Sequence, residues 1–144
     1  MYDKRFKFKG KKMFLNKLNE KEKVAFLELA YYVANSDENF STEEKNIIDV
    51  YCAEMQINDI DFDKSNFDLD STLLEIESLQ SQKIVLLEIM ALVYSDNILH
   101  QSEEEILEKI VNKFNLNPKL ALVYAEWSKA MLSLTNQGIA LIEL

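Results

Sequence analysis

Glycine and proline are almost absent from this chain. It has 2 glycines and 1 proline in 144 residues, where average usage would supply about ten and about seven. Hairpin turns and bulges depend on glycine, so a β-rich fold is disfavoured. Hydrophobic residues make up 48% of the chain and charged residues 28%, which is enough apolar material for a real core. The composition therefore predicts an all-α domain whose helices are joined by Asn, Asp and Ser loops.

Apolar residues recur at helical spacing and divide the chain into about six to seven helices. The expected helices cover residues 20–34, 42–55, 71–79, 81–94 and 118 onward, with a further short start at 13–18. Another expected helix runs to about Phe114 after a Gln101 or Ser102 cap. The last helix begins at Pro118 after an Asn117 cap, and Gly138 should end or break it. We expect these side chains to be largely buried: Leu27, Ala30, Val33, Ile47, Tyr51, Leu87, Val93, Ile106, Ile110 and Trp127.

A short acidic pattern occurs twice, once from Ser36 and again from Ser95. Residues 36–44 read SDENFSTEE, and residues 95–103 read SDNILHQSE. In each copy Ser-Asp ends an apolar helical segment, an apolar residue follows the Asp by three positions, and a Glu follows it by seven. Two long helix–loop–helix units suit a closed bundle better than an open array. The repeat therefore predicts a compact, pseudo-symmetric bundle.

The paired loops are candidate sites for a hard divalent cation. Carboxylates that bracket a tight interhelical loop can place several oxygens around one Ca²⁺ or Mg²⁺ ion. The pairs would be Asp37 with Glu44 and Asp96 with Glu103. The competing interpretation is structural, because Ser or Thr followed by Glu is an ordinary helix start and Asp often turns the chain before it. The recurrence of the pattern is what favours a cation.

Glu28 and Glu88 are the only charged residues within the apolar stretches 25–34 and 84–94. Unpaired and buried, either would be costly or protonated. A helical wheel places both at the less apolar edge of their helices, so half-exposure is an equal alternative. If they turn toward the loops, they supply a third carboxylate to each cation site.

The acidic connection at residues 58–70 has the spacing of an EF-hand calcium loop. The residues at its ligand positions would be Asp59, Asp61, Asp63, Ser65 and Asp70. Lys64 replaces the glycine that gives such a loop its sharp turn. We therefore interpret the segment as a solvated acidic linker.

Charge is distributed unevenly along the chain. Residues 1–12 carry six basic groups and one acidic group, a net charge of +5, so the overall −9 leaves −14 on the rest of the chain. A body this acidic repels phosphate backbones, which argues against nucleic acid as a partner. The basic arm interleaves Phe6 and Phe8 with lysines. We expect a flexible leader there, with contact to an anionic membrane surface as the alternative.

Nucleophilic catalysis has little support in the sequence. His100 is the only histidine, and no Ser has the glycine neighbours of a nucleophile elbow. Cys52, the only cysteine, falls on an apolar helix face and is expected to be a buried structural thiol. No apolar run approaches the length of a membrane span, and no signal peptide is recognisable. The expected compartment is the cytoplasm.

The repeated pattern resembles the motif of the TerB-like family, which includes tellurite-resistance TerB proteins and a domain of a membrane-anchored J-domain co-chaperone. That motif is roughly Ala-Asp-Gly, an apolar residue, a Ser or Thr, and one or two Glu. SDENFSTEE and SDNILHQSE are similar to it, and the motif glycine is Glu38 in the first copy and Asn97 in the second. The resemblance covers about residues 14–135.

The resemblance implies a pseudo-symmetric all-α bundle that serves as an acidic module in stress-response or membrane-associated complexes. Carried over residue by residue, the motif gives Asp37, Glu44, Asp96 and Glu103 as cation ligands, with Glu28 and Glu88 as weaker candidates. The main hypothesis is a non-enzymatic interaction module at residues 13–144 that binds protein partners and a divalent cation. The alternatives are a plain helical scaffold without an ion site and, last, a carboxylate-metal hydrolase.

Overall fold

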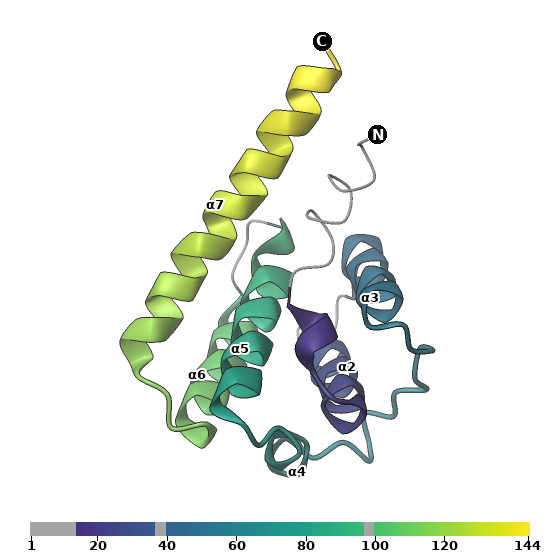
Figure 1. Cartoon of the computed structure of the whole chain (residues 1–144), viewed down its shortest axis with the longest axis vertical. Helices are drawn as coiled ribbons and strands as arrows, with labels where there is room; N and C mark the ends of the chain where they lie inside the picture. The colour runs from purple at the N-terminus through teal and green to yellow at the C-terminus, as the bar shows by residue number, and fades with distance from the viewer. Residues whose placement is uncertain (1–13, 37–39, 97–99) are drawn as a thin grey trace.

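The structure is a computed structural model, and it describes residues 14–36, 40–96 and 100–144 (Figure 1). Within these residues every regular element is helical and no strand forms, which confirms the all-α prediction. The basic arm at residues 1–12 lies outside the described residues. The elements in chain order are η1 (Leu15–Lys17), α2 (Glu20–Ala34), α3 (Thr42–Met55), α4 (Leu69–Leu74), α5 (Leu79–Val93), η2 (Tyr94–Asp96), α6 (Gln101–Lys113) and α7 (Pro118–Ile142).

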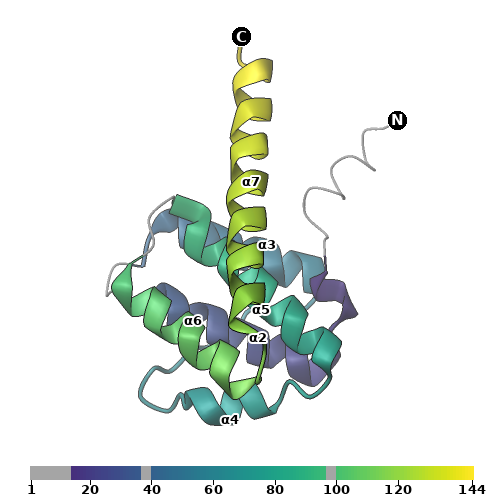
Figure 2. The same ribbon diagram turned by 90° about the vertical axis from the view of Figure 1, so that its left-hand side faces the viewer.

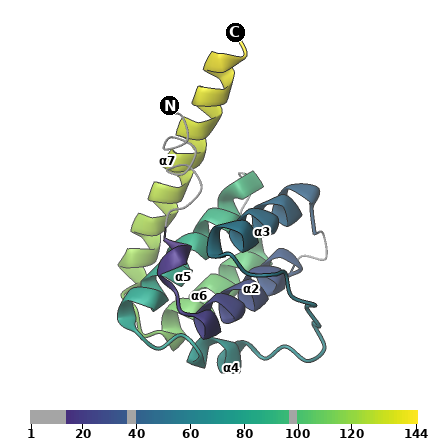
Figure 3. The same ribbon diagram turned by 45° about the vertical axis from the view of Figure 1, so that its right-hand side comes forward.

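Helices α2 and α5 pack against each other at the centre of the body. Helix α3 lies beside α2, α6 lies beside α5, and the short α4 closes one end (Figures 1 and 3). Phe26 and Leu29 on α2, with Leu86 and Ile89 on α5, are completely buried. The two central helices therefore supply much of the core, as their broad apolar faces predict.

The starts of α2 and α7 agree with the sequence prediction. The Asn19 Oδ1 atom accepts the Glu22 N–H at 2.8 Å, and the Glu22 Oε1 atom accepts the Asn19 N–H at 3.0 Å. This reciprocal capping box begins α2 at Glu20, the predicted first residue of the helix. Asn117 likewise caps α7, with Pro118 as the first helical residue. The caps are local, which is why spacing alone identifies them.

Both boundaries of α4 and the start of α5 differ from the prediction. The short helix expected at residues 71–79 begins earlier, at Leu69, because Asp68 Oδ2 accepts the Ser71 N–H at 2.9 Å and so serves as its N-cap. It also ends earlier, at Leu74. Ser78 caps the next helix, α5, so Leu79 is the first residue of α5.

The prediction that Gly138 ends or breaks the last helix is wrong. α7 continues to Ile142. A glycine inside a helix costs only about 1 kcal/mol relative to alanine, which the flanking helix formers can offset.

The starts of four helices are spaced like the two acidic patterns of the sequence. α2 begins at Glu20 and α5 at Leu79, which is the same offset as that between the two acidic patterns, and both helices have 15 residues. α3 and α6 begin with that offset too, at Thr42 and Gln101. Left-handed residues follow both, Gln56 at φ 57° and Asn115 at φ 55°. A rotation relating the two halves in space stays a prediction.

Most of the expected core is buried. Those confirmed are Leu27, Ala30, Val33, Tyr51, Val93, Ile106 and Ile110, whereas Ile47, Leu87 and Trp127 are only half-buried. Trp127 lies on the flank of α7, where one side of the indole contacts Phe14 with ring centroids 6.3 Å apart. Cys52 is buried as expected, and burial raises the pKa of its thiol to about 11.

Candidate functional site

The two predicted cation-binding loops are only partly within the described residues. Asp37 lies outside them, and so does the side chain of Asp96. Glu44 and Glu103 are both buried at helix starts. Glu44 Oε1 accepts the Ser41 N–H at 3.0 Å, and Glu103 Oε1 accepts the His100 N–H at 3.1 Å. These glutamates therefore cap α3 and α6; whether they also bind a cation stays a prediction.

The N-cap of α6 corrects the sequence-based assignment. The pattern predicts Gln101 or Ser102 as the cap, but Gln101 is already the first helical residue and His100 is the N-cap. Histidine is not among the preferred N-cap residues, so its identity gave no signal.

The two acidic patterns contact each other through a pair of serines. Ser36, just after α2, and Ser102, in the first turn of α6, have their Oγ atoms 3.4 Å apart. This contact places the residue that follows the C-cap of α2 beside the first turn of α6. Among the described residues, however, no group of three His, Cys, Asp or Glu side chains is placed to hold a metal ion.

Glu28 and Glu88 point to different parts of the fold. Glu28 is half-buried, and burial followed by the charge of Glu75 raises its pKa. It therefore faces the end of α4, since Glu75 immediately follows that helix. Glu88 is buried inside the body, only 8% exposed. The structure does not bring these two carboxylates together.

Glu88 forms a buried pair with Glu54, a residue that the sequence pattern does not single out. Glu54 lies on α3 and is 6% exposed. Burial first, and the charge of Glu54 second, raise the pKa of Glu88 to about 7 against the opposing hydrogen bond from the Phe14 N–H. The Oε2 atom of Glu88 is buried without a hydrogen-bond partner among the described residues.

The carboxylate pair holds the beginning of the described chain. Glu54 Oε2 accepts the Leu15 N–H at 3.1 Å, and the neighbouring Phe14 N–H is directed to Glu88. Tyr51 donates its hydroxyl to the Glu88 carbonyl at 3.2 Å, and burial raises the pKa of this phenol far above its ordinary value. The backbone of η1 thus enters the fold between two carboxylates. The sequence could have indicated that Glu54 faces inward, because its spacing from Ile47 and Tyr51 places all three on one helix face.

A second feature is a shallow hollow of about 400 Å³ beside the acidic linker, which we term the acidic–aromatic hollow. Its lining residues are Tyr31, Asn35, Phe40, Ile60, Asp61, Phe62 and Lys64. The Tyr31 ring stacks on Phe62 with centroids 5.6 Å apart and meets Phe40 edge-on at 5.9 Å. Aromatic rings from α2, the loop before α3 and the linker therefore converge on one surface.

A hydrogen-bond network fixes the Tyr31 ring. Its hydroxyl donates to Asp59 Oδ2 at 2.6 Å, and Lys45 donates to the same oxygen at 3.1 Å. Burial and Asp59 together raise the pKa of Tyr31 to about 12. Partial burial of Asp59 opposes its charge, but the hydrogen bonds that it accepts outweigh that effect and lower its pKa.

The EF-hand interpretation of the linker is disfavoured by how its carboxylates are used. Asp63 Oδ1 accepts both the backbone N–H and the hydroxyl of Ser65, which closes a local turn. Asp68 caps α4, and Asp59 binds Tyr31. These linker carboxylates are committed to separate local contacts, as expected for a solvated acidic linker.

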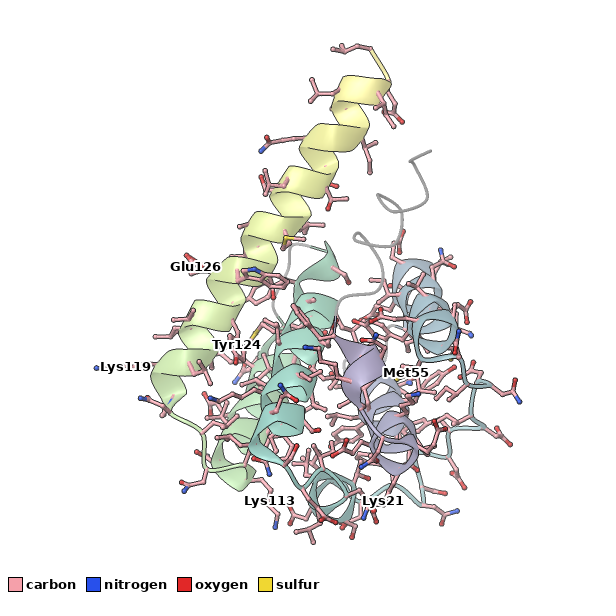
Figure 4. All side chains as sticks on the ribbon, viewed as in Figure 1. Lys21, Met55, Lys113, Lys119, Tyr124 and Glu126 are labelled. Carbon is pink, nitrogen blue, oxygen red and sulfur yellow. The ribbon has the colours of Figure 1, made fainter. Side chains whose placement is uncertain are left out.

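Helix α7 packs on the body through its first half only. Tyr124 points from α7 toward α5, whereas Glu126 points away from the body (Figure 4). Lys129 lies 5.1 Å from the centre of the Tyr94 ring and joins α7 to η2. Beyond this point the helix rises clear of the body (Figures 1 and 2).

The projecting half of α7 exposes large apolar side chains. Every residue from 133 to 144 is exposed. Leu134 is 62% exposed, Leu141 69% and Ile142 84%. We term residues 133–142 the projecting half. Several large apolar groups on one solvent-exposed helix indicate an interaction surface rather than scattered surface residues.

Comparison with known proteins gives no relative from which function could be transferred. No family model, no curated protein and no solved structure matches the chain. None of the described helices, α7 included, has both the length and the hydropathy that crossing a bilayer requires.

Proposed function

We propose that the chain is a non-enzymatic interaction module that associates with a second copy of itself through the projecting half of α7. The observation that carries this proposal is the continuity of the apolar face of α7. One stripe at helical spacing comprises Leu120, Tyr124, Trp127, Met131, Leu134, Gly138 and Leu141. In its first part Tyr124 packs against the core and Trp127 contacts Phe14, and its last part, with Ile142 beside it, is exposed.

The spacing of this stripe is that of a helix–helix seam. Its residues follow one another at alternating intervals of four and three, which is the a/d pattern of a two-helix seam. Two projecting halves can pair by burying the same face of each copy, an arrangement that closes as a twofold dimer. Gly138 leaves open space where a Cβ atom would lie, so a partner helix can approach closely there.

The distribution of charge favours the projecting half of α7, and not the acidic body, as the surface through which two copies pair. Residues 13–144 carry a net charge of −14, but residues 130–142 contain no charged side chain. The projecting half spans roughly 15 Å at about 1.5 Å per residue. That distance exceeds the screening length of about 8 Å at physiological salt, so two acidic bodies held apart by it repel only weakly.

The test is the oligomeric state of the full chain, measured by sedimentation over a wide range of protein concentration. A mass that rises from one copy to two supports the proposal. A single-copy mass at every concentration refutes association through α7. The resemblance to the TerB-like family supports the broader assignment, because it implies an acidic helical module acting in complexes.

Cation binding by the acidic loops is a second candidate function, favoured by the 3.4 Å contact between Ser36 and Ser102. A pseudo-twofold relation between the halves would bring the loops to one face. Supporting it, the third residues of α2 and α5 touch: Ser81 Oγ donates to Glu22 Oε1 at 3.0 Å. Equivalent residues meet at a twofold axis.

A cation that neutralises the loops should raise the melting temperature. At a concentration about 100 times the dissociation constant, binding to the folded state alone adds about 2.7 kcal/mol to the free energy of unfolding. The measurement is a thermal melt with Ca²⁺, Mg²⁺ or Mn²⁺ against chelator. The double variant Asp37→Asn and Asp96→Asn should lose the rise. A wild-type melting curve that ignores all three ions would leave the loops with a capping role only.

A further inference from the structure

We propose that the acidic–aromatic hollow binds residues 1–12 of the same chain. The proposal concerns a different surface from the projecting half of α7, so it stands or falls independently of dimer formation. It assigns an occupant to a hollow that combines partly accessible aromatic rings with a neighbouring acidic linker.

The hollow has a floor suited to aromatic side chains. Phe40 and Phe62 are half-buried, so part of each ring stays accessible, and Tyr31 is fixed between them by its bond to Asp59. Incoming rings stack favourably on such a floor at centroid distances of about 4.5–7 Å, and lysine ammonium groups can bind over ring faces. A rigid aromatic floor lowers the ordering cost of binding a peptide segment.

The rim of the hollow includes the acidic linker, and the charged residues that line the hollow itself are Asp61 and Lys64. Residues 58–70 carry five aspartates against Lys64 alone, a net charge of −4. Asp59 is paired with Lys45. Asp61, in contrast, lines the hollow and makes no hydrogen bond or ion pair with another described residue. It is therefore available to a cationic side chain from elsewhere.

The basic arm at residues 1–12 has the complementary chemistry. It carries a net charge of +5, in a chain whose remainder is acidic, and Phe6 and Phe8 alternate with Arg5, Lys7 and Lys9. In an extended segment alternate side chains point to opposite sides. Phe6 and Phe8 can then face the aromatic floor while the basic side chains reach the acidic rim.

The arm is long enough for this contact within one chain. An extended segment of its length spans about 40 Å. A body of this size has a radius of gyration of about 14 Å. Phe6 and Phe8 lie eight and six residues before Phe14, so in an extended chain they reach about 27 Å and about 20 Å from it. Tethering also gives the arm a local concentration in the millimolar range, which favours the same chain over a neighbouring copy.

The experiment compares NMR spectra of the full wild-type chain with those of the full chain carrying Phe6→Ala and Phe8→Ala. We expect the ring signals of Tyr31, Phe40 and Phe62 and the amide signals of residues 60–64 to differ between the two. Asp61→Asn in the full chain should reduce this difference. Asp70→Asn, which lies outside the hollow, is the matched control and should leave it intact.

Salt and dilution sharpen the test. Raising the ionic strength from about 0.05 M to about 0.5 M should remove most of the difference, because the pairing is partly electrostatic. Dilution should not change it, because the contact is within one chain. Spectra that differ only at α7, or nowhere, overturn the proposal. If the hollow signals of the wild type and of the Phe variant become identical on dilution, the contact is between chains, and the same-chain proposal is overturned.

Membrane contact is the competing role for the arm, and vesicles separate the two. Anionic vesicles that bind the wild type, together with hollow signals that are identical in the wild type and the Phe variant, would assign the arm to lipid and overturn the proposal. Neutral vesicles provide the control for charge.

Discussion

Replacing Glu88 by Gln is expected to remove a pH-dependent loss of stability of roughly 3 kcal/mol from this fold. Glu88 is buried beside Glu54, and its pKa is raised from 4.5 to about 7. A change of one pKa unit corresponds to about 1.4 kcal/mol of difference between the protonated and charged forms. Burial at 8% exposure leaves little solvent to screen the effect.

The sign of this pH dependence follows from whether the folded or the unfolded chain binds the Glu88 proton more tightly. Between pH 4.5 and about 7 the folded chain keeps Glu88 protonated while the unfolded chain has released that proton. The free energy of unfolding therefore falls as pH rises through this window and stays level above it. Gln carries no proton to lose, so the variant should show no such fall from this residue.

The measurement is chemical denaturation of both chains at several values between about pH 5 and about pH 8. The informative quantity is the change with pH of the difference between variant and wild type. It cancels the constant cost of placing an amide where Glu88 Oε2 has no partner among the described residues. Aspartates whose pKa values are lowered, such as Asp63 and Asp68, titrate below this window and do not interfere.

Two further variants identify the cause. Glu54→Gln should reduce the fall of the free energy of unfolding with pH without abolishing it. Burial is the larger cause of the raised pKa of Glu88, and the charge of Glu54 is the smaller. Glu28→Gln is the matched control: Glu28 is likewise the single acidic residue in the apolar stretch of its helix but is only half-buried, so its effect should be small. A wild type whose stability does not change between about pH 5 and about pH 8 would contradict the buried-pair explanation.

Features that depend on contacts between residues near in sequence could be predicted, whereas those that depend on how separate helices pack could not. α2 begins at a capping box between Asn19 and Glu22, which are three residues apart, so the sequence alone predicts its start. The Glu54–Glu88 pair depends on how α3 and α5 pack, and local spacing does not specify that. Glu44 shows the intermediate case, because capping and cation binding use the same residue types.

Helix α7 shows the same limit at its far end. Its apolar stripe is visible in the sequence, but periodicity alone does not say which part of a stripe the body covers. Gly138 suggests an end because glycine weakens helices, yet propensity differences of about 1 kcal/mol seldom decide a boundary alone. The structure shows that the stripe outlasts the body, and this mismatch is what points to a partner.

Replacing Leu134 and Leu141 by Ser is expected to weaken association of two copies by a factor on the order of 10⁴. Burying each leucine contributes roughly 1.5 kcal/mol or more, and a twofold dimer loses each of the two contacts twice. The sum is about 6 kcal/mol, at about 1.4 kcal/mol per tenfold change in affinity. Both side chains are more than half exposed in the single chain, so its own stability should barely change.

Leu122→Ser provides the matched control. Leu122 is 68% exposed on the same helix, comparable with Leu141 at 69%, but lies on the side of α7 away from the stripe. Sedimentation of wild type, double variant and control over the same concentrations gives the three dissociation constants. Equal weakening by Leu122→Ser would mean that general surface hydrophobicity, and not the stripe, drives association.

Salt dependence separates pairing through α7 from an ionic interface. The seam itself is uncharged, whereas the two chains that meet each carry a net charge of −9. Added salt screens the repulsion between the acidic bodies, so the wild-type dimer should become tighter as ionic strength rises. An interface held by the basic arm of one copy on the acidic body of another would weaken instead. A dimer that dissociates in salt would therefore place the contact elsewhere than on α7.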